Sequence, residues 1–544
     1  MLLKQTKIVA SISDRRCDVD FIKQLFEAGM NVVRMNTAHA SREGFEALIA
    51  NVRAVSNRIA ILMDTKGPEV RTTANAEPIP YKIGEKVKIV GNPDLETTRE
   101  CIAVSYSNFV SDLNIGGTIL IDDGDLELEV IDKTDGYLLC EVKNDATLGS
   151  RKSVNVPGVR INLPSLTEKD RNNILYAIEK DIDFIAHSFV RNRQDVLDIR
   201  AILDAHNSDI KIIAKIENQE GVENIDQILR VSDGIMVARG DMGVEIPLED
   251  VSVLQKMIIK KVYNAGKQVI TATQMLESMI KNPRPTRAEA TDVANAIYDG
   301  TSAIMLSGET AAGQYPVEAV RTMARIAERT EQDIDYIKRF KLREVETNPD
   351  VTTAISHATC TTAHDLGAAA IITVTKSGKT ARMISKFRPN CPIIGFSTEA
   401  RVCRQLNLSW GVTPLLIEEK ASTDDLFNHA VDSAEYAGLV KSGELVAITA
   451  GVPLGISGTT NMMKVHVVGH ILATGRGVTK KKTCARLCVC ESARQAQAEF
   501  RDGDILVIDH TTNDMLPLLK RAGGIITQPV SYTHLRAHET ELHL

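Results

Sequence analysis

Polar side chains follow several apolar, β-branched runs of this sequence at the point where each run ends. In a parallel barrel the carboxyl ends of the strands meet on one face, so side chains at those ends converge. Most of the residues at these ends are charged or carry hydroxyl groups: Arg34 and Asn36, Asp64, Thr65 and Lys66, Lys215 and Glu217, Arg239 and Asp241, Thr271 and Thr273, and Ser307 and Glu309. A face with oxygen ligands, a lysine and an arginine is suited to binding an anion together with a cation.

Lys215 and Glu217 form the most informative pair. They are two residues apart on one predicted strand, so they point to the same face, with Glu217 nearer the rim. If Asp241 ends the neighbouring strand, the two carboxylates repel each other unless a cation joins them, as Mg²⁺ or Mn²⁺ would. The alternative, that Lys215 and Glu217 only neutralise each other, stays open for that pair alone. Together with Arg34 and Thr273, the pattern favours a metal site.

A substrate that carries phosphate and carboxylate fits this set of groups. Lys215 can follow the charge on a transferring phosphoryl group while a divalent metal bridges the leaving and receiving oxygens. The segment 240–243 is expected to turn toward Pro247, where free backbone N–H groups could hold a carboxylate. The sequence has no Walker loop, because Thr373 stands where the first glycine should precede Gly378-Lys379-Thr380, and it has no G-x-G-x-x-G motif.

Eight strand-like runs alternate with helical patterns before about residue 330. The runs are 7–13, 31–38, 59–65, 182–190, 210–217, 234–241, 268–274 and 302–307. Near-continuous Val, Ile and Ala runs, each followed by a helix, indicate a parallel sheet that is buried on both faces. Eight such units predict an α/β fold with a closed (β/α)8 TIM barrel. An open, doubly wound sheet is the less favoured alternative.

Roughly ninety residues separate the third strand from its helix, far more than an ordinary βα loop contains. They carry short alternating strands and the turn pairs Asp123-Gly124 and Asp135-Gly136, which favour hairpins. We therefore predict a small all-β domain, inserted at the catalytic face of the barrel and placed to act as a lid.

A second α/β pattern begins near residue 340, and a partial third pattern follows it. The final residues show no usable periodicity and hold three histidines in fourteen residues, so we exclude them from the fold as a sequence scar or disordered tail. The predicted organisation is the barrel domain in two parts (1–68 and 164–338), the inserted lid (69–163), an α/β regulatory domain (339–470), a partial extra domain (471–530) and the tail (531–544).

The composition excludes several classes of protein. The 64 Lys+Arg and 71 Asp+Glu residues give a net charge of −7, which provides no bulk positive surface for nucleic acid or anionic membrane. We find neither a secretory leader nor an apolar run long enough to span a bilayer. Nine scattered cysteines fit reduced thiols and a cytoplasmic protein, and Cys484, Cys488 and Cys490 lack the spacing of a metal site.

Five segments of the sequence, in order, resemble the signature motifs of the pyruvate kinase family. They are Met63-Asp-Thr-Lys-Gly-Pro-Glu-Val-Arg71, Ala214-Lys-Ile-Glu-Asn218, Ala238-Arg-Gly-Asp-Met-Gly243, Thr271-Ala-Thr-Gln-Met-Leu-Glu-Ser-Met279 and Met305-Leu-Ser-Gly-Glu-Thr310. The resemblance covers about residues 5 to 470. It implies a barrel with an inserted β-domain lid, a regulatory C-terminal domain, usually a homotetramer, and phosphoryl transfer from phosphoenolpyruvate to ADP to give ATP and pyruvate in glycolysis.

The resemblance also implies roles for particular residues. Glu217 and Asp241 would hold Mg²⁺ or Mn²⁺, Lys215 would stabilise the phosphoryl group in flight, and Thr273 would bind the substrate carboxylate and help to protonate the enolate. The remaining residues would contact ligands: Arg34, Ser188 and Gly240 the substrate, His39, Arg71 and Lys152 the nucleotide phosphates, and Asn36, Asp64 and Thr65 a potassium ion.

Some positions depart from the family pattern or leave its details open. Ala38 replaces a serine that supplies a potassium ligand in the family, although Glu69 fits the variants that need this ion. The loop Thr375-Lys376-Ser377-Gly378-Lys379-Thr380 resembles the family's sugar-phosphate loop, and the segment 451–459 could close over it; a plain loop is the alternative. The sequence after Gly469 is similar to the front of the mobile domain of phosphoenolpyruvate-using enzymes, without the part that would carry its histidine.

Two other functions remain as alternatives to the phosphotransferase. A metal-dependent aldolase or lyase would act through a pyruvate enolate on a related barrel, but it would not need the inserted lid. A catalytically weak sensor would use only the C-terminal domain to bind a phosphorylated metabolite, but the retained strand-end residues argue against it.

Overall fold

The computed structural model describes residues 4–38, 41–343, 349–420, 422–452, 460–469, 477–479, 483 and 485–528. The chain forms two compact units: the larger is Met1–Val440 with Glu444–Val468, and the smaller is Lys441–Gly443 with Gly469–Leu544. Among the helices that the described ranges contain, none is long and apolar enough to cross a membrane.

Eight parallel strands close into a barrel in the larger unit, which confirms the predicted (β/α)8 fold. The strands are β1 (Lys7–Ser11), β2 (Val32–Asn36), β3 (Ala60–Asp64), β12 (Phe184–His187), β13 (Lys211–Ile216), β14 (Gly234–Ala238), β15 (Gln268–Ala272) and β16 (Ala303–Leu306). Each pairs with its neighbours in the chain, and β1 pairs with β16 to complete the ring. All eight carboxyl ends therefore lie on one face, which we call the mouth; we call the opposite face the base.

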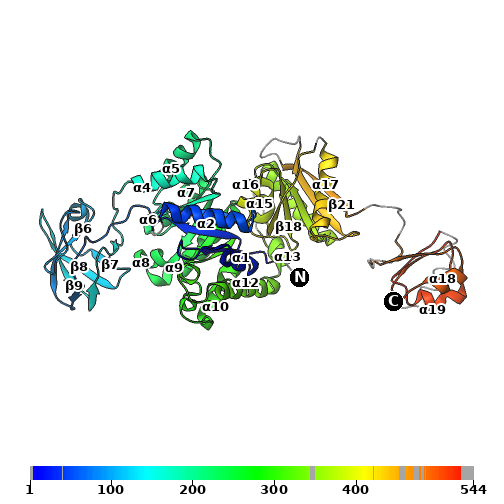
Figure 1. Ribbon diagram of the computed structural model, residues 1–544, viewed down its shortest axis with the longest axis horizontal. Helices are drawn as coiled ribbons and strands as arrows, with labels where there is room; N and C mark the ends of the chain where they lie inside the picture. Colours follow the sequence, from blue (N-terminus) through cyan, green and yellow to red (C-terminus); the bar gives the residue numbers. More distant parts are fainter. Residues whose placement is uncertain are drawn as a thin grey trace. The chain divides into compact units, whose positions relative to one another are not determined.

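Helices surround this barrel in Figure 1. They are α1 (Val19–Glu27), α2 (Arg42–Val55), α4 (Glu168–Glu179), α5 (Arg193–Ala205), α6 (Gln219–Glu223), α7 (Ile225–Val231), α8 (Arg239–Glu245), α9 (Leu248–Asn264), α10 (Arg287–Asp299), α11 (Gly308–Ala311), α12 (Pro316–Asp333) and α13 (Tyr336–Lys341). Thr167 and Thr286 begin α4 and α10 with capping boxes, and left-handed Gly300 ends α10. Alternate strand residues fill the barrel interior or pack against these helices, giving two buried apolar layers.

The segment between β3 and α4 folds around its own apolar core. Its strands are β4 (Ile79–Tyr81), β5 (Lys86–Gly91), β6 (Cys101–Val104), β7 (Thr118–Ile121), β8 (Leu126–Lys133), β9 (Leu138–Val142), β10 (Ala146–Leu148) and β11 (Val154–Asn155), with helix α3 (Phe109–Asp112). The strands β7, β8 and β9 pair as consecutive antiparallel hairpins, as the Asp-Gly turns predict.

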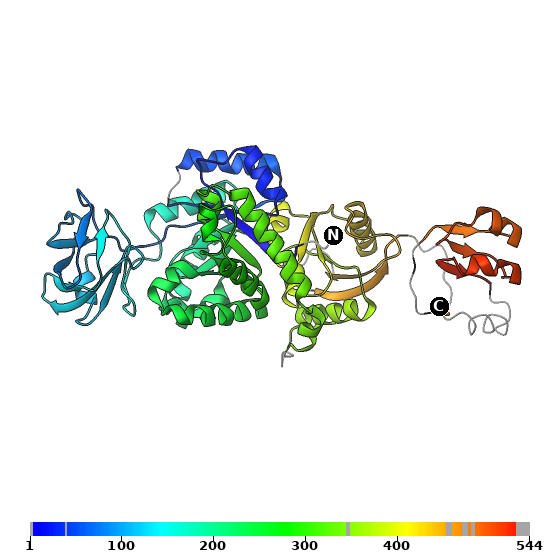
Figure 2. The ribbon, with the colours of Figure 1, turned by 90° about the horizontal axis from the view of Figure 1, so that it is seen from below.

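A five-stranded sheet follows the barrel, in the order β19-β18-β17-β20-β21. Its strands are β17 (Ala370–Val374), β18 (Ile393–Ser397), β19 (Val412–Leu416), β20 (Leu445–Gly451) and β21 (Thr460–Val467), and only β21 runs antiparallel to its neighbour. The helices are α14 (Val351–Leu366), α15 (Lys379–Lys386), α16 (Ala400–Leu406) and α17 (Thr423–Tyr436). The sheet lies between these helices in Figure 2, with one apolar cluster on the α14 and α15 face and another on the α17 face.

The smaller unit contains a three-stranded parallel sheet. Its elements are β22 (Leu487–Val489), α18 (Ala493–Glu499), β23 (Ile505–Val507), a short 3-10 turn (Asn513–Met515), α19 (Leu516–Leu519) and β24 (Gly524–Ile526). These strands and helices lie within the partial extra domain that the sequence predicts over residues 471–530. Residues 531–544 and Cys484 lie outside the described part of the chain.

Candidate active site

Lys215 occupies the centre of the mouth. Its side chain comes from the last residues of β13, and its Nζ lies 2.9 Å from Glu217 Oε1 and 3.3 Å from Asp64 Oδ1. It donates a hydrogen bond of 2.8 Å to Ser188 Oγ. Burial alone would lower the pKa of Lys215, but the two carboxylates outweigh burial and raise it, so this group is an ammonium at neutral pH.

Arg34 and Asp64 form a second charged pair on the adjacent strands β2 and β3. Arg34 Nε and Nη2 lie 2.7 and 2.6 Å from Asp64 Oδ2, and Nη1 donates to Ser11 Oγ at 2.9 Å. Burial would raise the pKa of Asp64, but Lys215 and Arg34 overcome it and lower the pKa. Ser11 was not among the predicted residues, although it is a hydroxyl residue at the end of β1 and pairs in register with Arg34.

Glu217 is 1% exposed, and its Oε2 accepts a 2.6 Å hydrogen bond from the backbone N–H of Phe189. Asp241 follows β14, whose Val237 pairs with Ile216 of β13, so the two acidic residues lie at the ends of neighbouring strands as predicted. Burial and the negative charge of Asp241 raise the pKa of Glu217 against the opposing effect of Lys215. A cation beside both carboxylates would relieve this repulsion.

Thr273 is held in an unusual backbone conformation. Its φ is +68° and that of Gln274 is +53°, both in the left-handed region that residues with a Cβ seldom adopt. The Gly240 N–H donates to Thr273 Oγ1 at 2.8 Å, and Arg239 Nη2 donates to the Thr273 carbonyl at 2.8 Å. These contacts fix a hydroxyl at the mouth.

The segment at Gly240 is helical rather than the turn that we expected. Residues Arg239–Glu245 form the short helix α8, which begins directly after β14. The prediction of a turn is therefore wrong. Neither Gly240 nor Gly243 adopts the left-handed φ that would turn the chain, and the Gly240 N–H, at the start of the helix, is satisfied by Thr273.

A cavity of about 650 Å³ lies between the inserted β segment and the mouth. Arg71, Lys152 and Asp241 all line it. Arg71 Nε lies 2.6 Å from Glu69 Oε2, and Lys152 Nζ lies 2.7 Å from Asp122 Oδ2. The structure therefore brings two of the three predicted nucleotide residues to the cavity, while His39 lies outside the described residues.

Two lining residues, Arg191 and Glu245, were not predicted from the sequence. Glu245 accepts a 3.0 Å hydrogen bond from Asn155 of the inserted segment, and Arg191 pairs with Asp195 at 3.1 Å. Glu245 had a usable signal, since it lies four residues after Asp241 and so one helical turn further along the same face.

The predicted potassium ligands lie at adjoining strand ends. Asn36 pairs in register with Asp64, and the Asn36 Oδ1 accepts a 3.0 Å hydrogen bond from the Ala38 N–H. The Thr65 carbonyl accepts from Ser188 Oγ at 2.7 Å. These residues therefore offer oxygen atoms as ligands for potassium, whereas the methyl side chain of Ala38 offers none.

The loop before α15 has features of an anion-binding loop. Gly378 has a φ of +76° at the helix N-terminus, and Thr380 Oγ1 lies 2.6 Å from Thr460 Oγ1. Arg382 Nη1 donates to the Ser377 carbonyl at 3.1 Å, and Thr375 is buried. Most of the predicted closing segment, residues 453–459, lies outside the described residues.

A closed parallel barrel whose mouth gathers a lysine, an arginine, paired carboxylates and a fixed hydroxyl is typical of an enzyme that transfers charged groups. The family model "Pyruvate kinase, barrel domain" matches residues 3–320, and "Pyruvate kinase, alpha/beta domain" matches residues 353–466. The chain belongs to the pyruvate kinase family, and it is a phosphotransferase that moves the phosphoryl group of phosphoenolpyruvate to ADP.

Curated relatives and solved structures agree. A pyruvate kinase of Geobacillus stearothermophilus is 50% identical over 534 residues, which cover 96% of this chain and 91% of that protein. One of Bacillus licheniformis is 48% identical, covering 97% and 91%. A crystal structure of a pyruvate kinase from Cryptosporidium parvum has a TM-score of 0.81 and 40% identity, covering 86% of this chain and 97% of that chain. Nothing in these likenesses favours the aldolase or lyase alternative.

Proposed function

We propose that the residues at the mouth divide the phosphoryl transfer among them. Lys215 places its ammonium beside the transferring phosphoryl group and stabilises the charge of its transition state. Arg34, fixed by Asp64 and Ser11, contacts the phosphate with its guanidinium. The observation that carries this proposal is the buried Lys215 ammonium, which lies within hydrogen-bond or ion-pair distance of Ser188, Asp64 and Glu217.

Thr273 has the second role, at the other end of the substrate. Its hydroxyl and the nearby Gly240 backbone bind the substrate carboxylate, and Ser188 orients Lys215. The Thr273 hydroxyl then helps to deliver a proton to the enolate after the phosphoryl group leaves. Its left-handed backbone, held by Arg239, supports this role because strained conformations cluster where a group must be precisely aimed.

Glu217 and Asp241 suit a divalent metal, Mg²⁺ or Mn²⁺. These residues supply two carboxylates, and within the described residues no group of three or more His, Cys, Asp or Glu side chains is arranged to hold a metal. Such a site agrees with Mg²⁺, which keeps several waters and takes further oxygens from the substrate. When bound, the ion would polarise the phosphate and enolate oxygens of the substrate.

Potassium fits the oxygen atoms of Asn36, Asp64 and Thr65. The two strand ends that carry them adjoin, which supports a shared ion. Because Ala38 has no hydroxyl, this site has one side-chain ligand fewer than the family pattern. The ion would balance the negative charge of the substrates beside Arg34.

Arg71 and Lys152 bind the nucleotide phosphates from the inserted segment, together with His39. Their place in the wall of the cavity supports this role. Each is paired with an acidic residue, so a polyphosphate would replace Glu69 and Asp122 as the partner. The segment 69–163 would then act as a lid that excludes water during the transfer.

The remaining proposals concern regulation and setting. Thr375, Ser377, Gly378, Lys379 and Thr380 would bind a phosphorylated effector, and the regulatory domain would span residues 339–470. We propose a homotetramer that works in the cytoplasm, with no nucleic acid or membrane partner.

Initial rates in a lactate-dehydrogenase-coupled assay test the proposal. We expect no pyruvate without ADP, no measurable rate without a divalent metal, and a lower rate without K⁺. An aldolase or lyase would instead release pyruvate from a hydroxy-oxo acid by C–C cleavage, with no need for ADP. A full rate in a metal-free, chelator-treated reaction would exclude the metal site at Glu217 and Asp241.

A further inference from the structure

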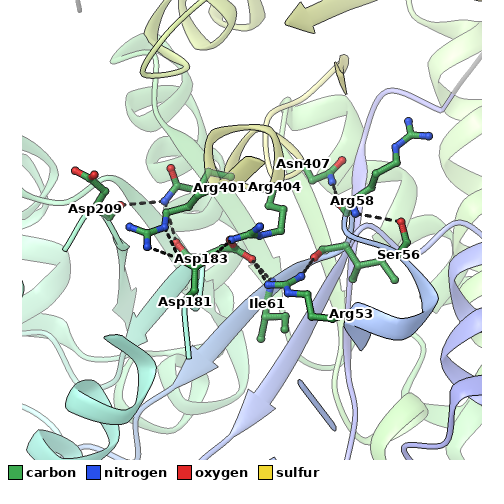
Figure 3. Close-up of polar contacts among 12 residues, drawn as sticks. Arg53, Ser56, Arg58, Ile61, Asp181, Asp183, Asp209, Arg401, Arg404 and Asn407 are labelled. Carbon is green, nitrogen blue, oxygen red and sulfur yellow. Dashed lines mark hydrogen bonds and ion pairs between the residues drawn. The ribbon is translucent and has the colours of Figure 1, made fainter. Parts of the chain in front are cut away.

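The base of the barrel holds a second group of buried charges, shown in Figure 3. Its centre is Asp183, which precedes β12 and is 0% exposed. Arg404 Nε lies 2.6 Å from Asp183 Oδ1, and Arg53 Nη2 lies 3.3 Å from Oδ2. Arg53 belongs to α2 of the barrel, whereas Arg404 belongs to α16 beside the five-stranded sheet. The carboxylate therefore joins the barrel to the second α/β region.

Asp183 also holds the starts of three barrel strands together. Its Oδ2 accepts the Ile61 N–H of β3 at 2.8 Å, and its own N–H donates to the Ile61 carbonyl at 3.2 Å. Its carbonyl accepts the Lys211 N–H of β13 at 3.2 Å. Asp183 itself directly precedes β12, so this one residue links the first residues of strands β3, β12 and β13.

The same three strands end at Lys215 and at two of the groups that contact its ammonium. Strand β3 ends at Asp64, β12 is followed by Ser188, and β13 carries Lys215. The residues at the base and those at the mouth are three to five steps apart along each strand, at roughly 3.3 Å per residue, so about 10–17 Å separates them. Paired strands of a closed barrel are stiff, so a shift at their starts moves their ends as well.

The second α/β region is firmly seated on this base. Gln405 Nε2 donates to the Asp183 carbonyl at 3.3 Å, and Arg404 Nη2 lies 2.6 Å from Asp181 Oδ2. Leu408 is 0% exposed and belongs to the apolar cluster inside the barrel. Because Arg404 and Asp183 are both buried, they cannot separate without leaving unpaired charges out of water, which is costly.

We propose that Asp183 and Arg404 are positioning residues for the phosphoryl transfer: through β3, β12 and β13 they set the place of Lys215 against Asp64 and Ser188. The second α/β region thereby acts on the mouth through one buried ion pair at the base. This inference rests on the proposed roles of Lys215 and Ser188. A structural brace alone would hold the fold without affecting turnover, so the two roles can be separated by kinetics.

The helix α16 offers a matched control. Arg401 also pairs with Asp181, at 2.7 Å from its Nε, but it makes no contact with the three strand starts among the described hydrogen bonds. The test compares Arg404→Met with Arg401→Met at saturating phosphoenolpyruvate, ADP and Mg²⁺, below the unfolding midpoint of each variant. Arg404→Lys and Gln405→Ala are assayed alongside, in case Arg404→Met does not fold.

We expect Arg404→Met to lower kcat about tenfold with a smaller change in the KM for phosphoenolpyruvate, because Lys215 acts in the transition state. Arg401→Met should lower kcat less than twofold, and Arg404→Lys should recover part of the lost kcat. In a Ser188→Ala background, Arg404→Met should lower kcat less than threefold, because the link through Ser188 is already absent.

Three results would overturn the inference: an unchanged kcat in a destabilised Arg404→Met, an equal loss in Arg401→Met, or full multiplication of the Ser188→Ala and Arg404→Met effects. An unchanged kcat in Ser188→Ala would instead refute the proposed role of Ser188, and this route with it. The two failures are therefore distinguishable.

Discussion

The mouth and the base of the barrel both gather buried charges, but they use them differently. At the mouth, Lys215 and Arg34 share Asp64 as a partner, Asp241 lines a cavity of about 650 Å³, and neighbouring backbone adopts left-handed φ values at Thr273 and Phe189. At the base, the Asp183 carboxylate is enclosed by two guanidinium groups and a backbone N–H. At the mouth, Arg71, Lys152 and Asp241 thus line open space, whereas the charges that hold the domains together at the base are enclosed by their partners.

The largest effect should come from removing the centre of the base. Asp183→Ala leaves the buried Arg404 and the partly buried Arg53 without their shared carboxylate, so we expect a loss of about 3–5 kcal/mol in the free energy of unfolding. Urea denaturation followed by circular dichroism measures it. A loss below about 1 kcal/mol would mean that the ion pairs of Asp183 with Arg53 and Arg404 do not stabilise the base as described.

At the mouth, the loss should appear in the catalytic rate. Lys215→Met removes the cation beside the transferring group, so kcat should fall by about 10²–10³ or more, equivalent to roughly 3–4 kcal/mol in the barrier. Affinity for the divalent metal, measured by Mn²⁺ titration, should change far less. Wild-type turnover in this variant would remove Lys215 from the mechanism.

The third prediction concerns His187, the last residue of strand β12, which precedes Ser188. It is buried with both ring nitrogens unpaired, and burial lowers its pKa from 6.5 to about 4. Between these values the unfolded chain binds a proton that the folded chain does not, so stability should fall as pH drops from about 6.5 to 4, by about 3 kcal/mol in all.

His187→Leu should flatten this part of the stability profile, because the titrating group is gone and no hydrogen bond is lost with it. Urea midpoints at pH 7, 6, 5 and 4.5 for both proteins provide the comparison. Parallel profiles for the two proteins would show that His187 is not the group responsible.

The smallest effect should come from an exposed pair at the base. The Arg401 side chain is 31% exposed and its partner Asp181 is 52% exposed, so Arg401→Met should cost less than about 1 kcal/mol in the free energy of unfolding. The same urea experiment, with and without 0.5 M NaCl, measures it. A loss as large as that of Asp183→Ala would erase the distinction between buried and exposed pairs at this face.

Much of the architecture could be predicted from the sequence because it follows from local patterns. Near-continuous apolar runs followed by amphipathic helices predict buried parallel strands, and the Asp-Gly pairs predict the hairpins of the inserted segment. Because the carboxyl ends of parallel barrel strands meet on one face, the sequence also predicted that Lys215, Glu217 and Arg34 lie together. The helical form of the segment at Gly240 was not predicted, because glycine-rich sequences carry little propensity of their own.

Contacts between distant segments were beyond reach of the sequence. Ser11 supports Arg34 from another strand, and Asn155 contacts Glu245 across 90 positions of the chain. The eight residues from Asp181 to Ser188 hold both a domain contact and a hydrogen bond at the mouth, yet their sequence predicts only one more strand.

The sequence by itself determined the number of barrel strands, the position of the insertion and the chemical types at the strand ends, because these depend on periodicity and composition along the chain. Only the tertiary structure decided which charges became partners. Closure of the barrel brings residues from separate strands within about 3 Å, and at that distance burial and neighbouring charge, rather than residue type, set the pKa and the freedom of each group.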